Sequence, residues 1–507
     1  MDSIFVNKDR RVLPNWRQFD DTISNNELSS NFINNTIVKN LSIEDYSNSF
    51  KNNKLISTAG DLISAAYVNG FPNNDIVQDA ADFILNNKDK STSILIDLSQ
   101  SIKNGTNGIK NIIGTLNNDN ELQIKEQIIS SIKKLKPKIK NFINNPINYV
   151  ELSRLYTILG FKEKSINNMK IALNLAPENR FILRSASRLF SHYDLEEYIC
   201  KIIQKTNIVR YDPWVASAEI ALATMINRKS LNIRNSFQII ESKKFSPFQI
   251  TELASSLGTL EYYHGNIKKT KKLIKESLIQ PNDNTLAQFE WINNRENFID
   301  FQSNDNNIKN NYEALALANY YGGHYNQALD NVKKWFLDLP FSSRSIKFGY
   351  HIASNILNDN NTSLELLKLG LISHPKDPFL INNISYQFAL SNKIKEAEKL
   401  LNLVDKESLS DVDKLCLKAT SGLIHFRKGD IFVGRQLYHE VMNKTKISKK
   451  EYYWLAYLNL LREEILIDSE FSNNLKLDLE KIPNNTGFIQ INKLKNEISD
   501  LLAKNKI

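Results

Sequence analysis

The chain has 507 residues, which is long enough to bury one large core or several smaller cores in series. Its hydrophobic content of 41% excludes wholesale disorder, and its 16 glycines and 12 prolines, roughly half the usual share, favour long helices with short connections. The formal charge of +9 is modest for this length. The two cysteines, Cys200 and Cys416, supply no disulfide framework, so we expect two buried thiols.

Residues 1–145 show helical apolar spacing but no repeat. The segments 59–67 and 76–85 have this spacing, and Asn74 or Asp75 would cap the second of these helices. We therefore expect a divergent helical N-terminal region.

From residue 146 onward, a frame of aromatic, aliphatic, small, glycine and proline residues recurs. Its first copy consists of Tyr149, Leu152, Ser153, Tyr156, Gly160, Ser165, Met169, Ala172 and Pro177. A second copy consists of Tyr312, Leu315, Ala316, Asn319, Gly323, Ala328, Val332, Trp335 and Pro340. Later copies place Ser363, Ala397 and Gly434 in the position of Ala328, each just after a turn residue: Asn358, Asn392 and Gly429.

This frame resembles the tetratricopeptide repeat, in which an aromatic-x2-Leu-Gly-x2-Tyr pattern, an Ala-x3-Phe pattern and a proline recur about every 34 residues. Small residues would let two antiparallel helices approach closely, and the glycines suit the left-handed backbone conformation that ends a helix. The proline would end the second helix of each pair. The resemblance implies an all-α fold, a right-handed superhelical solenoid of antiparallel helix pairs.

The strength of the frame divides the chain. It is strong in 146–179, 309–343, 344–377 and 378–408, and fair in 415–447. Between the first two copies the pairs have decayed, although Asp212-Pro213-Trp214 is typical of the start of a first helix. The predicted parts are a divergent helical region 1–145, helix pairs 146–294, a polar linker or loop 295–311, repeats 312–447 and a C-terminal helical cap 448–507, with one strong helix at 452–462.

Catalytic and metal-binding motifs are absent from the sequence. It contains no phosphate-binding glycine loop, no nucleophile elbow, no His-Glu-x2-His and no paired Cys-x2-Cys. The seven histidines are scattered, and we expect each to be a surface or turn residue. We therefore predict no enzyme, no cofactor and no metal.

The location in the cell follows from two features. The first ten residues lack the apolar core of a signal peptide, and the most apolar run, 452–461, is too short to span a bilayer. These features predict a cytoplasmic protein that does not contact a membrane.

The first helix of each tetratricopeptide pair lines the concave face where partners bind, and the resemblance therefore implies a partner-binding groove. Residues at i, i+4 and i+7 of each first helix share one side. Tyrosine offers contact area and asparagine bonds a partner's backbone in both senses, which suits an extended peptide. The predicted groove residues are Arg154, Tyr320, Phe348, Asn355, Asn382, Tyr386 and Phe426.

Two lysine-rich stretches support an alternative, because such runs track phosphates. Neither has interleaved aromatics or arginines that would stack on bases, so a solvated helix face is the simpler interpretation. The candidate anion-binding residues are Lys133, Lys134, Lys136, Lys268, Lys269, Lys271 and Lys272.

Repeats without a catalytic motif favour a scaffold or regulatory subunit that binds another protein or peptide, for example in a bacterial defence or toxin-regulating system. The alternatives are nucleic-acid binding through the lysines and an unrecognised enzyme within residues 1–145.

Overall fold

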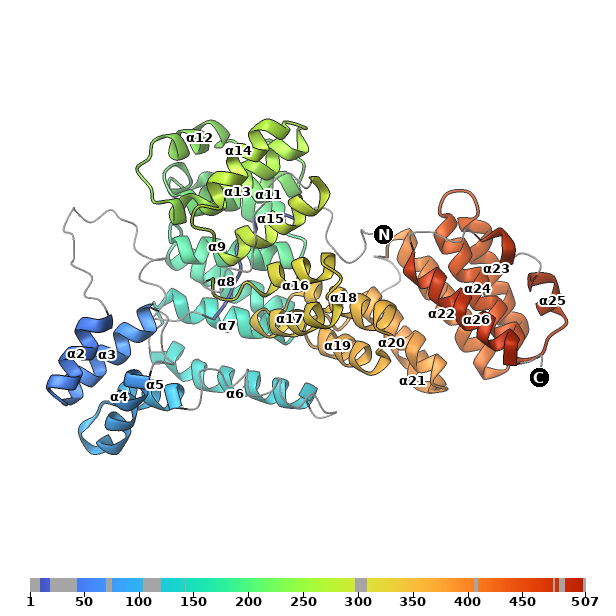
Figure 1. Ribbon diagram of the computed structural model, residues 1–507, viewed down its shortest axis with the longest axis horizontal. Coiled ribbons are helices and arrows are strands. Elements are labelled where there is room, and N and C mark those ends of the chain that lie inside the picture. Colours follow the sequence, from blue (N-terminus) through green and yellow to red (C-terminus); the bar gives the residue numbers. More distant parts are fainter. Residues whose placement is uncertain are drawn as a thin grey trace. The chain divides into compact units, whose positions relative to one another are not determined.

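The computed structural model describes residues 10–18, 43–69, 75–103, 120–141, 143–296, 308–404, 409–476, 479–482 and 488–504. Every regular element in these residues is a helix, and helices that are consecutive in the chain pack as neighbouring pairs (Figure 1). The predicted all-α fold, a solenoid of antiparallel helix pairs, is confirmed. The helices fall into two compact units, which comprise Arg11–Tyr156 with Lys162–Thr285, and Met1–Arg10 with Thr157–Phe161 and Leu286–Ile507.

The unit that contains Lys162–Thr285 begins with the helices of the N-terminal region. The predicted helices at 59–67 and 76–85 lie within α3 and α4, and Asp75 is the first residue of α4. The helices before the repeats are α2 (Ile43–Asn52), α3 (Ile56–Asn69), α4 (Asp75–Asn86), α5 (Ser93–Lys103) and α6 (Asn120–Asn141). They are followed by α7 (Pro146–Ile158), α8 (Lys162–Leu175), α9 (Arg180–His192), α10 (Glu196–Lys205), α11 (Pro213–Met225), α12 (Ile233–Glu241), α13 (Pro247–Tyr263), α14 (Ile267–Ser277) and the start of α15 (Asp283–Glu296).

The start of α11 shows how local sequence fixes a helix end. The carboxylate of Asp212 accepts hydrogen bonds from the backbone N–H groups of Trp214 and Val215, at 2.9 and 3.1 Å. Pro213 occupies the first helical position, where no N–H is needed. The predicted first helix at this point is therefore confirmed.

The unit that contains Leu286–Ile507 carries the clearer repeats. Its helices are α16 (Tyr312–Tyr321), α17 (Tyr325–Asp338), α18 (Ser343–Tyr350), the π-helix η4 (His351–Ile356), α19 (Asn360–Ser373), α20 (Pro378–Leu390), α21 (Ile394–Leu401), α22 (Asp411–Lys428), α23 (Ile431–Thr445), α24 (Lys450–Leu466), α25 (Phe471–Lys476) and α26 (Ile489–Lys504). Gly323 and Gly429 have φ of +78° and +97°, and Asn358 and Asn392 also have positive φ. The predicted left-handed turns are thus confirmed.

The predicted division of the chain at residues 145, 294, 311 and 447 stays a prediction. Residues 297–307, most of the predicted linker, lie outside the described residues. The predicted helix at 452–462 lies within α24. Within the part of the chain that the structure describes, no helix is both long and apolar enough to cross a membrane.

Small residues let α22 and α23 approach closely. A Cβ atom on Gly434 would lie 2.5 Å from Cδ2 of Phe426 and 3.0 Å from the carbonyl oxygen of Gly422. Any side chain larger than hydrogen would force the ring of Phe426 to move and would crowd the backbone of α22 at Gly422. The sequence frame had indicated this position, because Gly434 stands where other copies have serine or alanine.

We expect Gly434→Val to lower the free energy of unfolding by about 1–3 kcal/mol, because the added methyl groups overpack the contact between α22 and α23. Urea denaturation followed by circular dichroism measures the change. Phe432→Val on the same helix is the matched control, since Phe432 is 78% exposed. Equal stability of the two variants would contradict the close approach.

Candidate functional site

Residues 11–18 form an irregular segment that is nevertheless buried. Val12 and Trp16 are each 1% exposed, and Leu13 and Pro14 are also buried. An irregular segment with this degree of burial is held by other elements, because it has no helical hydrogen bonds of its own. We call residues 11–17 the N-terminal segment.

Polar contacts with three residues more than 250 positions away, Tyr263, Asp283 and Asn284, fix the N-terminal segment. The guanidinium group of Arg11 lies 4.2 Å from the ring centre of Tyr263 and donates to its hydroxyl oxygen. Asp283, the first residue of α15, accepts hydrogen bonds on Oδ2 from Asn15 Nδ2 at 2.8 Å and from Arg17 at 2.5 Å. The segment is therefore held by cations at both ends.

The third of these residues, Asn284, binds the backbone of the segment. The side-chain amide of Asn284 donates to the carbonyl oxygen of Leu13 at 2.8 Å. The same Nδ2 lies 3.3 Å from Oε1 of Glu252. Asn284 thus joins the segment to a buried polar network.

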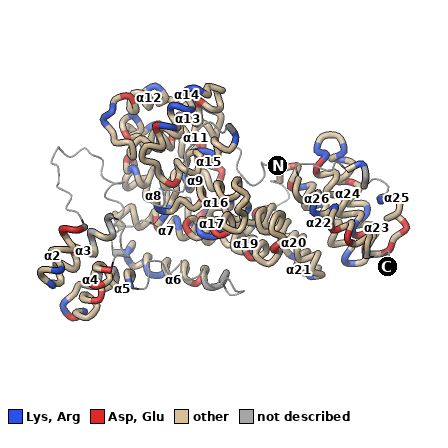
Figure 2. The backbone as a smooth tube through the Cα atoms, in the orientation of Figure 1, with Lys and Arg blue, Asp and Glu red and all other residues tan. Residues whose placement is uncertain are grey.

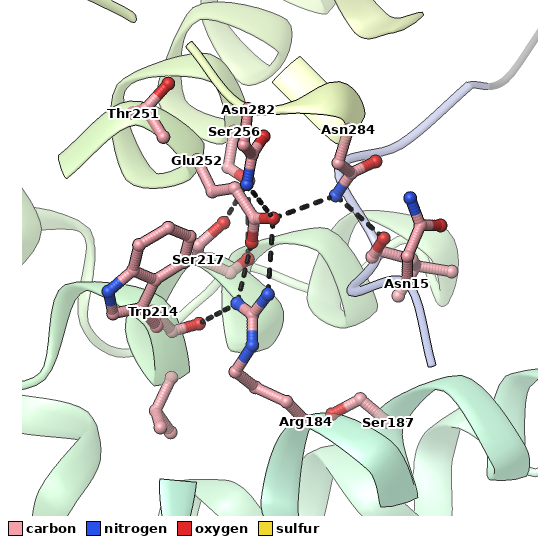
Figure 3. A network of polar contacts seen from close by, with 12 residues as sticks. Asn15, Arg184, Ser187, Trp214, Ser217, Thr251, Glu252, Ser256, Asn282 and Asn284 are labelled. Atoms are coloured by element: carbon pink, nitrogen blue, oxygen red, sulfur yellow. Dashed lines mark hydrogen bonds and ion pairs between the residues drawn. The ribbon is translucent and has the colours of Figure 1, made fainter. Parts of the chain in front are cut away.

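Glu252 lies at the centre of this network (Figure 3). Glu252 is 1% exposed, so the negative charge of its carboxylate must be compensated by hydrogen bonds and an ion pair. Arg184 supplies two hydrogen bonds, from NH1 to Oε2 at 2.7 Å and from NH2 to Oε1 at 3.2 Å. Asn282 Nδ2 donates to Oε1 at 2.8 Å. The carboxylate is therefore paired and fully hydrogen-bonded, and it holds the amide of Asn284 in place.

Local sequence positions each partner of Glu252. Asn282 precedes α15 and accepts from the N–H of Thr285 at 2.9 Å through its Oδ1, which leaves its Nδ2 for Glu252. Arg184 lies one turn after Arg180 on α9, and Arg180 pairs with Asp212 at 2.5 Å. The guanidinium group of Arg184 also lies 4.8 Å from the ring centre of Trp214. Both arginines therefore join α9 to the start of α11.

The predicted groove residues fall into several environments, and their binding role stays a prediction. Arg154 is buried in an ion pair with Glu151, at 2.6 Å. Asn382 accepts from Thr420, and Phe426 is buried against Tyr438. Tyr386 donates to Asn459 at 2.9 Å and accepts from Arg462 at 3.0 Å.

The other three predicted groove residues meet around His351. Tyr320 packs against the buried Phe348, with ring centres 5.1 Å apart. Its hydroxyl lies 3.0 Å from Nε2 of His351, and Asn355 Nδ2 lies 3.1 Å from Nδ1. His351 is buried, so the prediction that every histidine is a surface or turn residue is wrong at this position. A single histidine in the sequence gives no sign of the neighbours that bury it, here at the start of η4.

The lysine-rich stretches lie on α6 and α14, where Figure 2 shows basic residues along both helices. Lys133, Lys134 and Lys136 are exposed on α6. On α14, Lys268, Lys269 and Lys272 are exposed and Lys271 is half-buried. Anion binding by these side chains stays a prediction.

The cysteines are candidates for nucleophiles only as thiolates. Burial raises the pKa of Cys200 and of Cys416 to about 11, so both remain protonated at neutral pH. Cys200 is buried as predicted, whereas Cys416 is only half-buried. In the described ranges, no group of three or more His, Cys, Asp or Glu side chains is placed to hold a metal ion.

Sequence reasoning missed the N-terminal segment and the residues that hold it: Arg184, Glu252, Asn282, Asp283 and Asn284. The one available signal was composition. Val12, Leu13, Pro14 and Trp16 form an apolar cluster without helical or strand spacing.

No protein-family model matches the sequence, and no curated protein matches it at a significant level. Among solved structures, the crystal structure of the yeast Tom70 matches over 78% of this chain and 97% of that chain, with 12% sequence identity and a TM-score of 0.28. A TM-score of this size does not define a shared fold. The helix pairs themselves, with left-handed turns between paired helices, make the described part of the chain an all-helical solenoid.

Proposed function

We propose that this protein is a non-enzymatic scaffold that binds an extended segment of a partner protein across the first helices of its pairs. The observation that carries the proposal is the bound N-terminal segment. Its backbone is recognised by Asn284, its apolar side chains are buried, and its arginines are paired. This combination of backbone bonds and side-chain anchors is how extended peptides are recognised in general.

The position of the site supports the proposal. Arg184, Trp214 and Glu252 come from α9, α11 and α13, the first helices of three consecutive pairs, and Asn282 directly precedes α15. The tetratricopeptide resemblance implies that first helices line the binding face. We propose a second binding surface at Tyr320, Asn382 and Tyr386, the predicted groove residues of this unit that are partly exposed. A role in a bacterial defence or toxin-regulating system belongs to this proposal as the setting in which such a scaffold acts.

The test is a tagged purification of the full chain from its native host, followed by mass spectrometry. We expect one abundant protein to be retained by the wild type and lost from an Asp283→Lys variant, because the new cation repels arginines at this position. Lys275→Ala is the matched control, since Lys275 is an exposed residue on α14. Recovery of no protein, or equal recovery with both variants, would contradict binding at this site.

A further inference from the structure

We infer that the site formed by Tyr263, Asp283 and Asn284 selects peptides with an aliphatic-Leu-Pro-x-Trp-Arg pattern, and that the N-terminal segment occupies it as a built-in competitor. This inference rests on the proposed function and adds the chemistry of the ligand and the control of access to it.

The backbone of the ligand must be extended next to a proline. Pro14 disfavours the helical conformation for Leu13, which directs the Leu13 carbonyl outward to the amide of Asn284. Proline also restricts the free peptide, so less conformational entropy is lost on binding. A helical ligand would satisfy this carbonyl internally and would offer nothing to Asn284.

Apolar anchors determine which side chains fit. Trp16 is 1% exposed and is among the largest fully buried side chains of the chain, and Val12 is equally buried. A buried tryptophan contributes more to binding than most contacts of an interface. The spacing Leu-Pro-x-Trp therefore defines the ligand more strongly than its polar positions do.

The two ends of the ligand are recognised through their positive charges. Arg11 stacks on the ring of Tyr263, and Arg17 pairs with Asp283, whose side chain is 13% exposed. A partner with acidic residues at these positions would be repelled by Asp283 and would lose the contact with Tyr263. The ligand is therefore a basic peptide.

The polar part of the site is built by the helix pairs and not by the segment. Arg184 and Asn282 satisfy the carboxylate of Glu252 from within the helix pairs, and α11 packs on α9 and α13. Glu252 in turn lies within reach of the Asn284 amide, so this donor is positioned from within the helix pairs. A peptide from another protein would meet the same donors and the same anchors, and it would have to displace the N-terminal segment.

The test measures binding of a fluorescent synthetic peptide with the sequence of residues 11–18 to the full chain by fluorescence anisotropy. A Leu13→Ala, Trp16→Ala double variant loosens the built-in competitor, and we call it the opened chain. We expect the opened chain to bind the peptide at least about tenfold more tightly than the wild type, because the apparent Kd falls as the fraction of vacant site rises. A peptide carrying Trp16→Ala is the control and should bind at least about tenfold more weakly.

Equal affinity for both chains, absence of binding to the opened chain, or equal affinity of the control peptide would overturn the inference. If the opened chain does not fold, an Arg17→Glu variant loosens the segment through a partly exposed residue and serves in its place. A charge exchange adds specificity: with Asp283→Lys in the opened chain, the peptide carrying Arg17→Glu should bind better than the unchanged peptide.

The two proposals fail separately. A host partner that is lost from Asp283→Lys but is not displaced by excess peptide would leave the scaffold function standing and remove the ligand assignment. Peptide binding with no host partner would do the opposite.

Discussion

Glu252→Ala is expected to lower the free energy of unfolding by about 3–5 kcal/mol, because it breaks a buried ion pair and leaves its partners uncompensated. The side chain of Glu252 is 2% exposed and that of Arg184 is 17% exposed. Without the carboxylate, the guanidinium group and the amide of Asn282 lose their acceptor in a site that water reaches poorly. Urea denaturation at neutral pH, followed by circular dichroism, measures the loss.

Two further variants show whether the charge pair is the cause. Glu241→Ala removes an exposed carboxylate in the same unit and should change stability by no more than about 0.5 kcal/mol. The double variant Arg184→Met, Glu252→Met should cost less than Glu252→Ala alone, because no unpaired charge stays buried. A double variant that is less stable than the single one would show that Arg184 acts mainly through other contacts, such as Trp214.

Acid is expected to destabilise the unit that contains His351 as the pH falls below about 6.5. Burial lowers the pKa of His351 to about 4, and its ring is held neutral between the hydroxyl of Tyr320 and the amide of Asn355. A proton added at Nδ1 would face the N–H donor of Asn355 instead of an acceptor. The unfolded chain, with an ordinary histidine pKa near 6.5, therefore binds a proton that the folded chain excludes.

Because the unfolded chain binds this extra proton, the free energy of unfolding falls as the pH falls. The stabilising contribution is present above pH ~6.5 and is lost as the pH falls from there towards 4. The loss between pH 7 and pH 5 is about 2 kcal/mol for one such group. His374 adds to it, because burial also lowers its pKa to about 4.

Unfolding by urea at pH 7 and pH 5 tests this prediction with one variant. His351→Gln should reduce the difference in unfolding free energy between the two pH values by about 2 kcal/mol. Identical pH dependence in the wild type and in His351→Gln would show that His351 does not carry the effect.

Contacts between residues far apart in the chain could not be predicted from the sequence. Glu252 looks like an ordinary helical glutamate, and only the structure reveals that an arginine 68 positions earlier and two asparagines after α14 neutralise and bind it. Likewise, the carbonyl of Leu13 meets Asn284 across 271 positions. The seven groove residues were chosen from helix spacing, which gives a side of a helix but not the neighbour that covers it.

Local features, by contrast, were determined by the sequence alone. The scarcity of glycine and proline, the recurring frame and the Asp212-Pro213-Trp214 helix start were enough to predict helix pairs, because helix formation depends on residues within a few positions of one another. Gly323 and Gly429 marked turns for the same reason. Tertiary structure decided the burial of Glu252 and His351 and the binding of the N-terminal segment. Those outcomes depend on which side chains three-dimensional packing brings together, and no local pattern encodes that.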